Sequence, residues 1–139
     1  MSRKAARDLA FKLIYQLEMH REDIDEQIAI FYRENSVDDK DKEYINEVVR
    51  GVLHEKDALD GFVQKYSRGW KLSRISKVDL AILRLALYEM TRMKEIPQSV
   101  SINEAVELAK KYSGSEAGAY INGVLGRILR EELEQESKL

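Results

Sequence analysis

The chain has 139 residues, a formal net charge of −2, 44% hydrophobic and 35% charged residues, one proline and no cysteine. This length and composition fit one globular domain with a sizeable core, and the missing cysteine excludes disulfides and thiolate-bound metals. Because the N-terminus lacks the pattern of a signal peptide and no apolar run is long enough to cross a bilayer, we expect a cytoplasmic protein without a membrane partner.

Apolar residues at helical spacing predict an N-terminal half at about residues 1–68. Its first element is an amphipathic helix over roughly 3–19, and the second is a short helix over 23–34. After a polar stretch, a long helical segment follows, with a break expected near Lys56–Asp57. No stretch shows the alternating pattern of a strand, which favours helices throughout.

A C-terminal half, about residues 69–133, is expected after a connection over Ser67–Ser76. Ser76 is a candidate N-cap, because Ser76-x-x-Asp79 resembles a capping box. The residues Leu80–Met90 are apolar on nearly all sides of a helix. This helix is therefore predicted to be the central and most buried element.

Two more helices are predicted after Pro97. A capping box that opens at Ser101 predicts the start of the first, and Gly114 is expected in the left-handed conformation that ends it. The last helix is predicted to begin near Ser115 and to be followed by an acidic tail at residues 134–139.

The last helical segment contains three glycines, and each costs about 1 kcal/mol relative to alanine inside a helix. We expect close helix–helix packing to explain Gly123 and Gly126. Gly118 is expected in the first turn, where the chain is less constrained.

The sequence gives little support for catalysis. His20 and His54 lie in different segments and form no metal-ligand pair. The pattern Gly114-x-x-x-Gly118 lacks the Gly-Lys-Ser/Thr of a phosphate-binding loop. We therefore expect no enzymatic activity, no cofactor and no metal ion.

Charge is distributed unevenly along the chain. Residues 65–94 contain eight basic residues against two acidic ones, although the whole protein is slightly acidic. On the first helix, Arg3, Arg7, Phe11 and Tyr15 recur every four residues and share one stripe. Guanidinium groups beside aromatic rings suit single-stranded RNA, whose phosphates need cations and whose bases need stacking surfaces. The alternative is an ordinary amphipathic helix whose rings, Phe11 above all, belong to the core.

Several short motifs follow one another in a specific order. They are Arg-x-x-Ala-Arg-x-x-Ala at Arg3–Ala10, Asp60-Gly61 before Tyr66, Val78–Glu89, Ile96-Pro97, Ile102–Lys110 and Tyr120–Leu125. In this order, and in a chain of this size, they resemble the NusB family of bacterial transcription antitermination factors over essentially the full length.

The resemblance implies an all-α fold of about seven helices in two packed bundles that form one compact domain. It also implies binding to single-stranded boxA RNA of rRNA leader transcripts together with ribosomal protein NusE, within the RNA polymerase antitermination complex that reads through terminators in rRNA synthesis. Carried over by position, the RNA-binding residues are Arg3, Lys4, Arg7, Tyr66, Arg84, Glu116 and Tyr120. The residues facing NusE are Tyr15, Asp79 and Glu89.

Two other functions stay open. One is a protein–protein adaptor that uses the basic segment 65–94. The other is the RNA-binding domain that occurs fused to rRNA cytosine methyltransferases, for whose methyl-donor-binding domain we expect no room in this chain. A monomer and a homodimer fit the sequence equally well.

The expected phosphate contacts allow an estimate of RNA binding. The four cations Arg3, Lys4, Arg7 and Arg84 predict a slope of about −3 for log K against log salt with single-stranded RNA. So few contacts predict weak affinity for the protein alone, with NusE raising it cooperatively. A substitution Arg7→Glu is then expected to weaken RNA binding at unchanged thermal stability.

Overall fold

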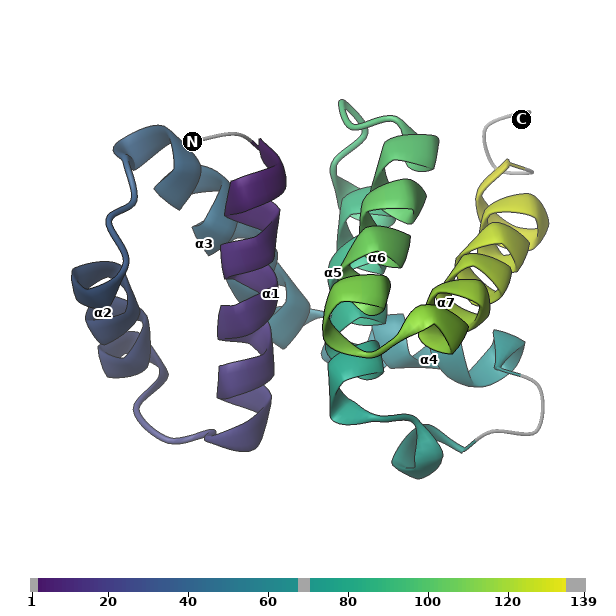
Figure 1. The fold of residues 1–139 in the computed structure, drawn as a ribbon, viewed down its shortest axis with the longest axis horizontal. Helices are drawn as coiled ribbons and strands as arrows, with labels where there is room; N and C mark the ends of the chain where they lie inside the picture. The colour runs from purple at the N-terminus through teal and green to yellow at the C-terminus, as the bar shows by residue number, and fades with distance from the viewer. Residues whose placement is uncertain (1–2, 68–70, 135–139) are drawn as a thin grey trace.

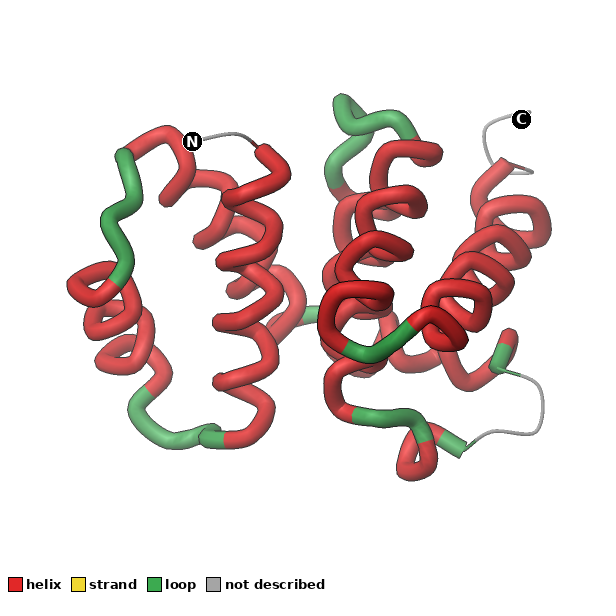
Figure 2. Tube along the Cα trace, viewed as in Figure 1, coloured by secondary structure: helices red, strands yellow, loops and turns green. Residues whose placement is uncertain are grey.

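The computed structural model describes residues 3–67 and 71–134, and over these ranges it is all-helical (Figure 2). The α-helices are α1 (Arg3–Met19), α2 (Ile24–Glu34), α3 (Asp39–His54), α4 (Lys56–Tyr66), α5 (Lys77–Arg92), α6 (Gln98–Tyr112) and α7 (Ser115–Ile128). A short 3-10 turn, η1 (Leu72–Arg74), precedes α5, and a π-helical turn, η2 (Leu129–Leu133), continues α7. The predicted all-α class is confirmed. The predicted break near Lys56–Asp57 is also found, because α3 ends at His54 and α4 begins at Lys56, with Glu55 between them.

The helices form two packed bundles, as predicted (Figure 1). Helices α1, α2 and α3 lie together, and α6 and α7 form the other side of the molecule with α4 across their end. Helix α4 packs on α5 and α7, and also contacts α3. The predicted division of the chain near residue 68 does not coincide with these bundles, because α4 belongs to the predicted N-terminal half but packs on α5 and α7. The division itself stays a prediction.

Helix α5 is the central element, which confirms the prediction from its apolar surface. It packs against α1, α3, α4, α6 and α7, and every residue from Leu80 to Met90 is buried. Its start also follows the sequence, because the Ser76 hydroxyl accepts a hydrogen bond from the Asp79 amide at 3.0 Å. No hydrogen bond from the Ser76 amide back to the Asp79 carboxylate is found among the described residues, and Oδ1 of Asp79 is buried without a partner.

Two predicted ends around α6 are wrong. The helix begins at Gln98, directly after Pro97, so Ser101 lies inside it and not at its N-cap. The Ser101 hydroxyl is turned into the core, where it donates to Glu89 at 2.7 Å. Gly114 has φ +130° and ψ 169°, which is an extended conformation open to glycine but outside the left-handed helical region.

The glycine predictions are wrong about packing, although Gly118 lies in the first turn of α7 as predicted. A Cβ at Gly123 would have no atom within 4 Å, and one at Gly126 would meet only the flexible end of Arg130. Gly118 is the glycine that packs closely, with a Cβ position 3.2 Å from Lys110 Cγ on α6. The closest approach involves Gly51 on α3, where a Cβ would overlap the ring of Tyr88 on α5.

Candidate nucleic-acid interface

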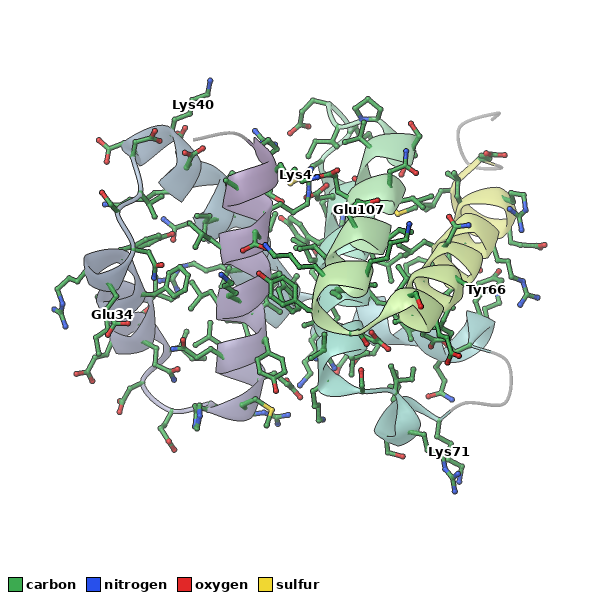
Figure 3. The ribbon with its side chains drawn as sticks, viewed as in Figure 1. Lys4, Glu34, Lys40, Tyr66, Lys71 and Glu107 are labelled. Atoms are coloured by element: carbon green, nitrogen blue, oxygen red, sulfur yellow. The ribbon has the colours of Figure 1, made fainter. Side chains whose placement is uncertain are left out.

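Two of the predicted RNA-binding cations lie exposed at the start of α1. Lys4 has a side chain that is 70% exposed, with its ammonium 3.9 Å from Glu104 on α6. Arg3 is exposed, with its guanidinium 4.4 Å from the ring centroid of Tyr44 on α3. Lys4 and Glu107 line a hollow of about 500 Å³ between α1 and α6, and Figure 3 shows both residues along this seam.

Arg7 is one turn further along α1 but is buried, with 4% of its surface exposed. Its Nε donates to Glu89 at 2.8 Å and its Nη2 donates to the other carboxylate oxygen at 3.0 Å. Glu89 is 1% exposed and also accepts from the hydroxyls of Tyr44 and Ser101. Burial alone would lower the pKa of Arg7, but the hydrogen bonds and charge of Glu89 raise it. Burial and the Glu89 charge together raise the pKa of Tyr44. The structure thus places Arg7 and Glu89 in an internal network that joins α1, α3, α5 and α6.

Arg84 is likewise buried, with 4% exposure, and carboxylates hold it. Its Nε and Nη2 donate to Asp60 on α4 at 2.7 and 2.9 Å, and Glu18 on α1 lies 3.5 Å away. Burial alone would raise the pKa of Glu18, but Lys56, Arg21 and Arg84 outweigh it and lower that pKa to about 2. Direct phosphate contact by Arg7 or Arg84, and direct NusE contact by Glu89, would require these buried groups to leave their partners.

Four of the eight basic residues in segment 65–94 form ion pairs with acidic side chains of the protein. Besides Arg84, three of its cations lie within ion-pair distance of acidic side chains: Lys65 with Glu132, Lys77 with Glu18 and Arg92 with Glu55. Lys71, Arg74 and Lys94, by contrast, are exposed and have no ion pair among the described residues. Arg68 lies outside the described residues. A charge count along the sequence therefore overstates the cations that this surface offers to a polyanion.

Two predicted RNA-binding aromatics lie together on α4 and α7. Tyr66 and Tyr120 line one hollow of about 250 Å³, with Gly123 and Arg127 beside them. The Tyr120 hydroxyl lies 2.9 Å from the hydroxyl of Ser67, which fixes the ring at the end of α4. Tyrosine faces of this kind can stack on unpaired bases.

Gly123 and Arg127 were not among the predicted site residues, although their spacing on α7 could have indicated them. Positions i, i+3 and i+7 lie on one face of a helix, and Tyr120, Gly123 and Arg127 have this spacing on α7. Gly123 has no Cβ, so it leaves the floor of this hollow open.

Tyr120 also borders a second hollow, of about 440 Å³. Asp79 at the start of α5, Glu116 at the start of α7, and Arg74 of η1 line it. The two hollows share Tyr120, so the structure brings Tyr66, Tyr120, Glu116 and Asp79 onto one continuous surface. Carboxylates there can accept hydrogen bonds from base amino groups.

The residues expected to face NusE do not lie together. Asp79 and Glu89 are ten residues apart on α5, which separates them by about 15 Å along the helix axis. Tyr15 is half-buried on α1, with its ring centroid 6.4 Å from that of Phe11. Phe11 itself is 4% exposed and packs 5.0 Å from Tyr112, so its expected place in the core is confirmed.

Other kinds of site find no support in the part of the chain that the structure describes. Within residues 3–67 and 71–134, no group of three His, Asp or Glu side chains could hold a metal ion. Over the same ranges, no helix has the length and apolar character that crossing a membrane requires.

Comparison with known proteins agrees with this architecture. The NusB family model matches residues 4–130. The transcription antitermination protein NusB of Acetivibrio thermocellus is 53% identical over 133 residues, which cover 96% of this chain and 92% of that protein. NusB of Ruminiclostridium cellulolyticum is 47% identical, with 99% of this chain and 94% of that protein covered.

Solved structures give the same result. A T. maritima NusB structure is 35% identical with a TM-score of 0.88, and covers 100% of this chain and 99% of that chain. A chain in a crystal structure of antitermination factors NusB and NusE in complex with dsRNA is 27% identical with a TM-score of 0.83, and covers 92% of this chain and 96% of that chain. On the family match, the sequence identities and the shared fold, this chain belongs to the NusB family.

Proposed function

We propose that the protein is a transcription antitermination factor that binds boxA RNA of rRNA leader transcripts together with NusE and promotes read-through by RNA polymerase. Family membership supports the general role, because the curated relatives are transcription antitermination proteins. The structural neighbour in complex with NusE and RNA supports the two partners. The boxA sequence and the rRNA leader are the finer part of the proposal.

The observation that carries the proposal is the surface around Tyr66 and Tyr120. Both rings are half-buried, so they are held in place and still present part of their surface. Glu116 lies exposed beside Tyr120 as a hydrogen-bond acceptor, and Arg74 is exposed at the same hollow. Stacking platforms, an acceptor and a cation in one place are what binding of unpaired nucleotides requires.

The cations that we propose to contact phosphates are four exposed residues, two at the start of α1 and two in or next to η1. They are Arg3, Lys4, Lys71 and Arg74. Four such contacts again give a slope of about −3 for log K against log salt with a single strand. We assign Arg7 and Arg84 to positioning, because each holds α1 or α4 against α5 through a buried carboxylate pair.

NusE binding is proposed to involve Tyr15 and Asp79, which are accessible in part. Glu89 would act there only by holding α1 and α5 in place. With only the four proposed phosphate contacts on a protein of net charge −2, RNA affinity should be weak without the partner. NusE then extends the RNA surface and raises the affinity.

The test is a titration of fluorescent boxA RNA, and of a scrambled sequence, with and without purified NusE at fixed salt. We expect boxA to bind more tightly than the scrambled RNA, and NusE to increase the difference. Tyr120→Leu should weaken binding about tenfold, because one stacked base contributes about 1–3 kcal/mol. Tyr32→Leu is the matched control, since Tyr32 is a half-buried tyrosine on α2, away from this surface. Equal binding of both RNAs, with and without NusE, would contradict the proposal, and an adaptor without RNA function would bind neither.

A further inference from the structure

A carboxylate of the C-terminal segment closes one edge of the Tyr66 surface. In η2, Glu132 lies against the end of α4, where one of its oxygens, Oε1, accepts from two donors at once. The Lys65 ammonium donates at 2.7 Å and the Tyr66 hydroxyl donates at 2.8 Å. Figure 3 shows Tyr66 beside α7, from which η2 continues.

These two donors form a small anion site. The Lys65 ammonium also lies 5.4 Å from the Tyr66 ring centroid, so the pair is held as a unit. The hydrogen bond from Lys65, and to a smaller extent the one from Tyr66, lowers the pKa of Glu132. The hydrogen bond to Glu132 in turn raises the pKa of Lys65. A non-bridging phosphate oxygen has the same negative charge and accepts from the same kinds of donor.

The site is accessible and adjoins the proposed base-binding hollow. The Lys65 side chain is 65% exposed, so a ligand can reach its ammonium from solvent. Tyr66 belongs to both places, because its hydroxyl binds Glu132 while the residue lines the hollow with Tyr120. A nucleotide stacked in that hollow would have its phosphate within reach of Lys65.

We propose that Lys65 and the Tyr66 hydroxyl form a phosphate-binding subsite for single-stranded RNA, and that Glu132 occupies this subsite in the free protein. The subsite rests on the proposed RNA-binding function and adds Lys65 to its contacts. RNA must displace the Glu132 carboxylate to use the subsite, so the C-terminal segment competes with RNA and limits affinity.

Glu132→Gln tests this competition. The substitution keeps the side-chain shape and removes the charge that mimics phosphate. BoxA RNA affinity in the presence of NusE should rise about two- to fivefold, in line with an exposed ion pair of ordinary strength. The slope of log K against log salt should become steeper by up to about 0.7, because Lys65 then contacts phosphate without competition from Glu132.

Glu131→Gln is the matched control. Glu131 is the preceding residue, is exposed and forms no ion pair within the described residues, yet its substitution changes the net charge equally. Its effect should be smaller and should disappear at about 0.15 M salt, where charges more than about 8 Å apart are largely screened.

Lys65→Met completes the test. Alone it should weaken RNA binding, and combined with Glu132→Gln it should abolish the gain in affinity, because that gain depends on the released ammonium. The inference is overturned if Glu132→Gln binds no more tightly than Glu131→Gln, if its salt slope is unchanged, or if the gain survives without Lys65. These outcomes are distinct from failure of the proposed function, in which the unmodified protein with NusE binds boxA RNA no better than the scrambled sequence.

Discussion

Replacing Arg7 tests whether the buried arginine supports the fold or contacts RNA. Glu89 is 1% exposed, and in Arg7→Met its carboxylate would keep only the hydroxyls of Tyr44 and Ser101 as donors. Two charge-assisted hydrogen bonds are lost, at 2.8 and 3.0 Å, and each is of the kind that contributes about 1.5–3 kcal/mol. Removing one partner of a buried pair costs about 3–5 kcal/mol, which agrees with that sum.

We therefore expect the free energy of unfolding of Arg7→Met to fall by about 3–5 kcal/mol, and its Tm to fall by about 10–20 °C. Urea unfolding followed by circular dichroism measures the first quantity, and a thermal scan measures the second. Lys4→Met is the control, because Lys4 lies one turn earlier on α1 and is 70% exposed, so its change should stay within about 0.5 kcal/mol.

The double variant Arg7→Met/Glu89→Met separates the charge pair from packing. With both charges removed, much of the lost stability should return, because apolar side chains of similar volume can replace a buried ion pair at little cost. If Arg7→Met is as stable as Lys4→Met, the network does not stabilise the fold and the reasoning fails. The sequence-based expectation of unchanged stability for an Arg7 substitution would then be correct after all.

Three further predictions concern other parts of the molecule. Gly51→Ala should lower the free energy of unfolding, measured by urea unfolding, by about 1–3 kcal/mol, because the new Cβ overlaps the Tyr88 ring and pushes α3 away from α5. A change below about 0.5 kcal/mol would show that the Tyr88 ring can move aside at little cost. Gly123→Ala should raise the free energy of unfolding by about 0.5–1 kcal/mol, because alanine has the higher helix propensity. It should also weaken boxA binding, because the new Cβ narrows the hollow lined by Tyr66 and Tyr120. Unchanged RNA affinity would argue against this hollow as the base-binding site. Because the pKa of Glu18 is lowered from 4.5 to about 2, its stabilisation is complete above about pH 4.5 and is lost as the pH falls towards 2. The urea midpoint of the unmodified protein should therefore approach that of Glu18→Gln over this interval, and a constant gap between the two would contradict the assignment.

The helices were predictable because their cause is local. Apolar spacing and the Ser76 cap depend on residues within one or two turns, and both are confirmed in α5. The start of α6 was not predictable in this way, because the Ser101 hydroxyl had a competing partner in Glu89, twelve residues earlier in the chain. A capping motif takes account only of hydrogen bonds within the first turn of the helix, and not of a distant residue that competes for the same side chain.

The candidate interface shows the same limit. The sequence places Arg3, Lys4 and Arg7 on one helix but cannot tell which of them faces Glu89, 82 residues away from Arg7. Tyr66 and Tyr120 come together only because α4 packs across α7. Exposure of a charged group depends on such long-range partners, so the residue types were predictable and their accessibility was not.

The burial of α5 on all sides has a consequence for how the protein can be divided. Leu80–Met90 supply core contacts to both bundles, so neither bundle keeps its apolar surface covered without this helix. A fragment ending before α5 would expose the inner faces of α1 and α3, and a fragment starting there would expose one side of α5 itself. We therefore expect the two bundles to unfold as one cooperative unit, and the surface that carries Tyr120 and Asp79 to be lost in smaller fragments of the chain.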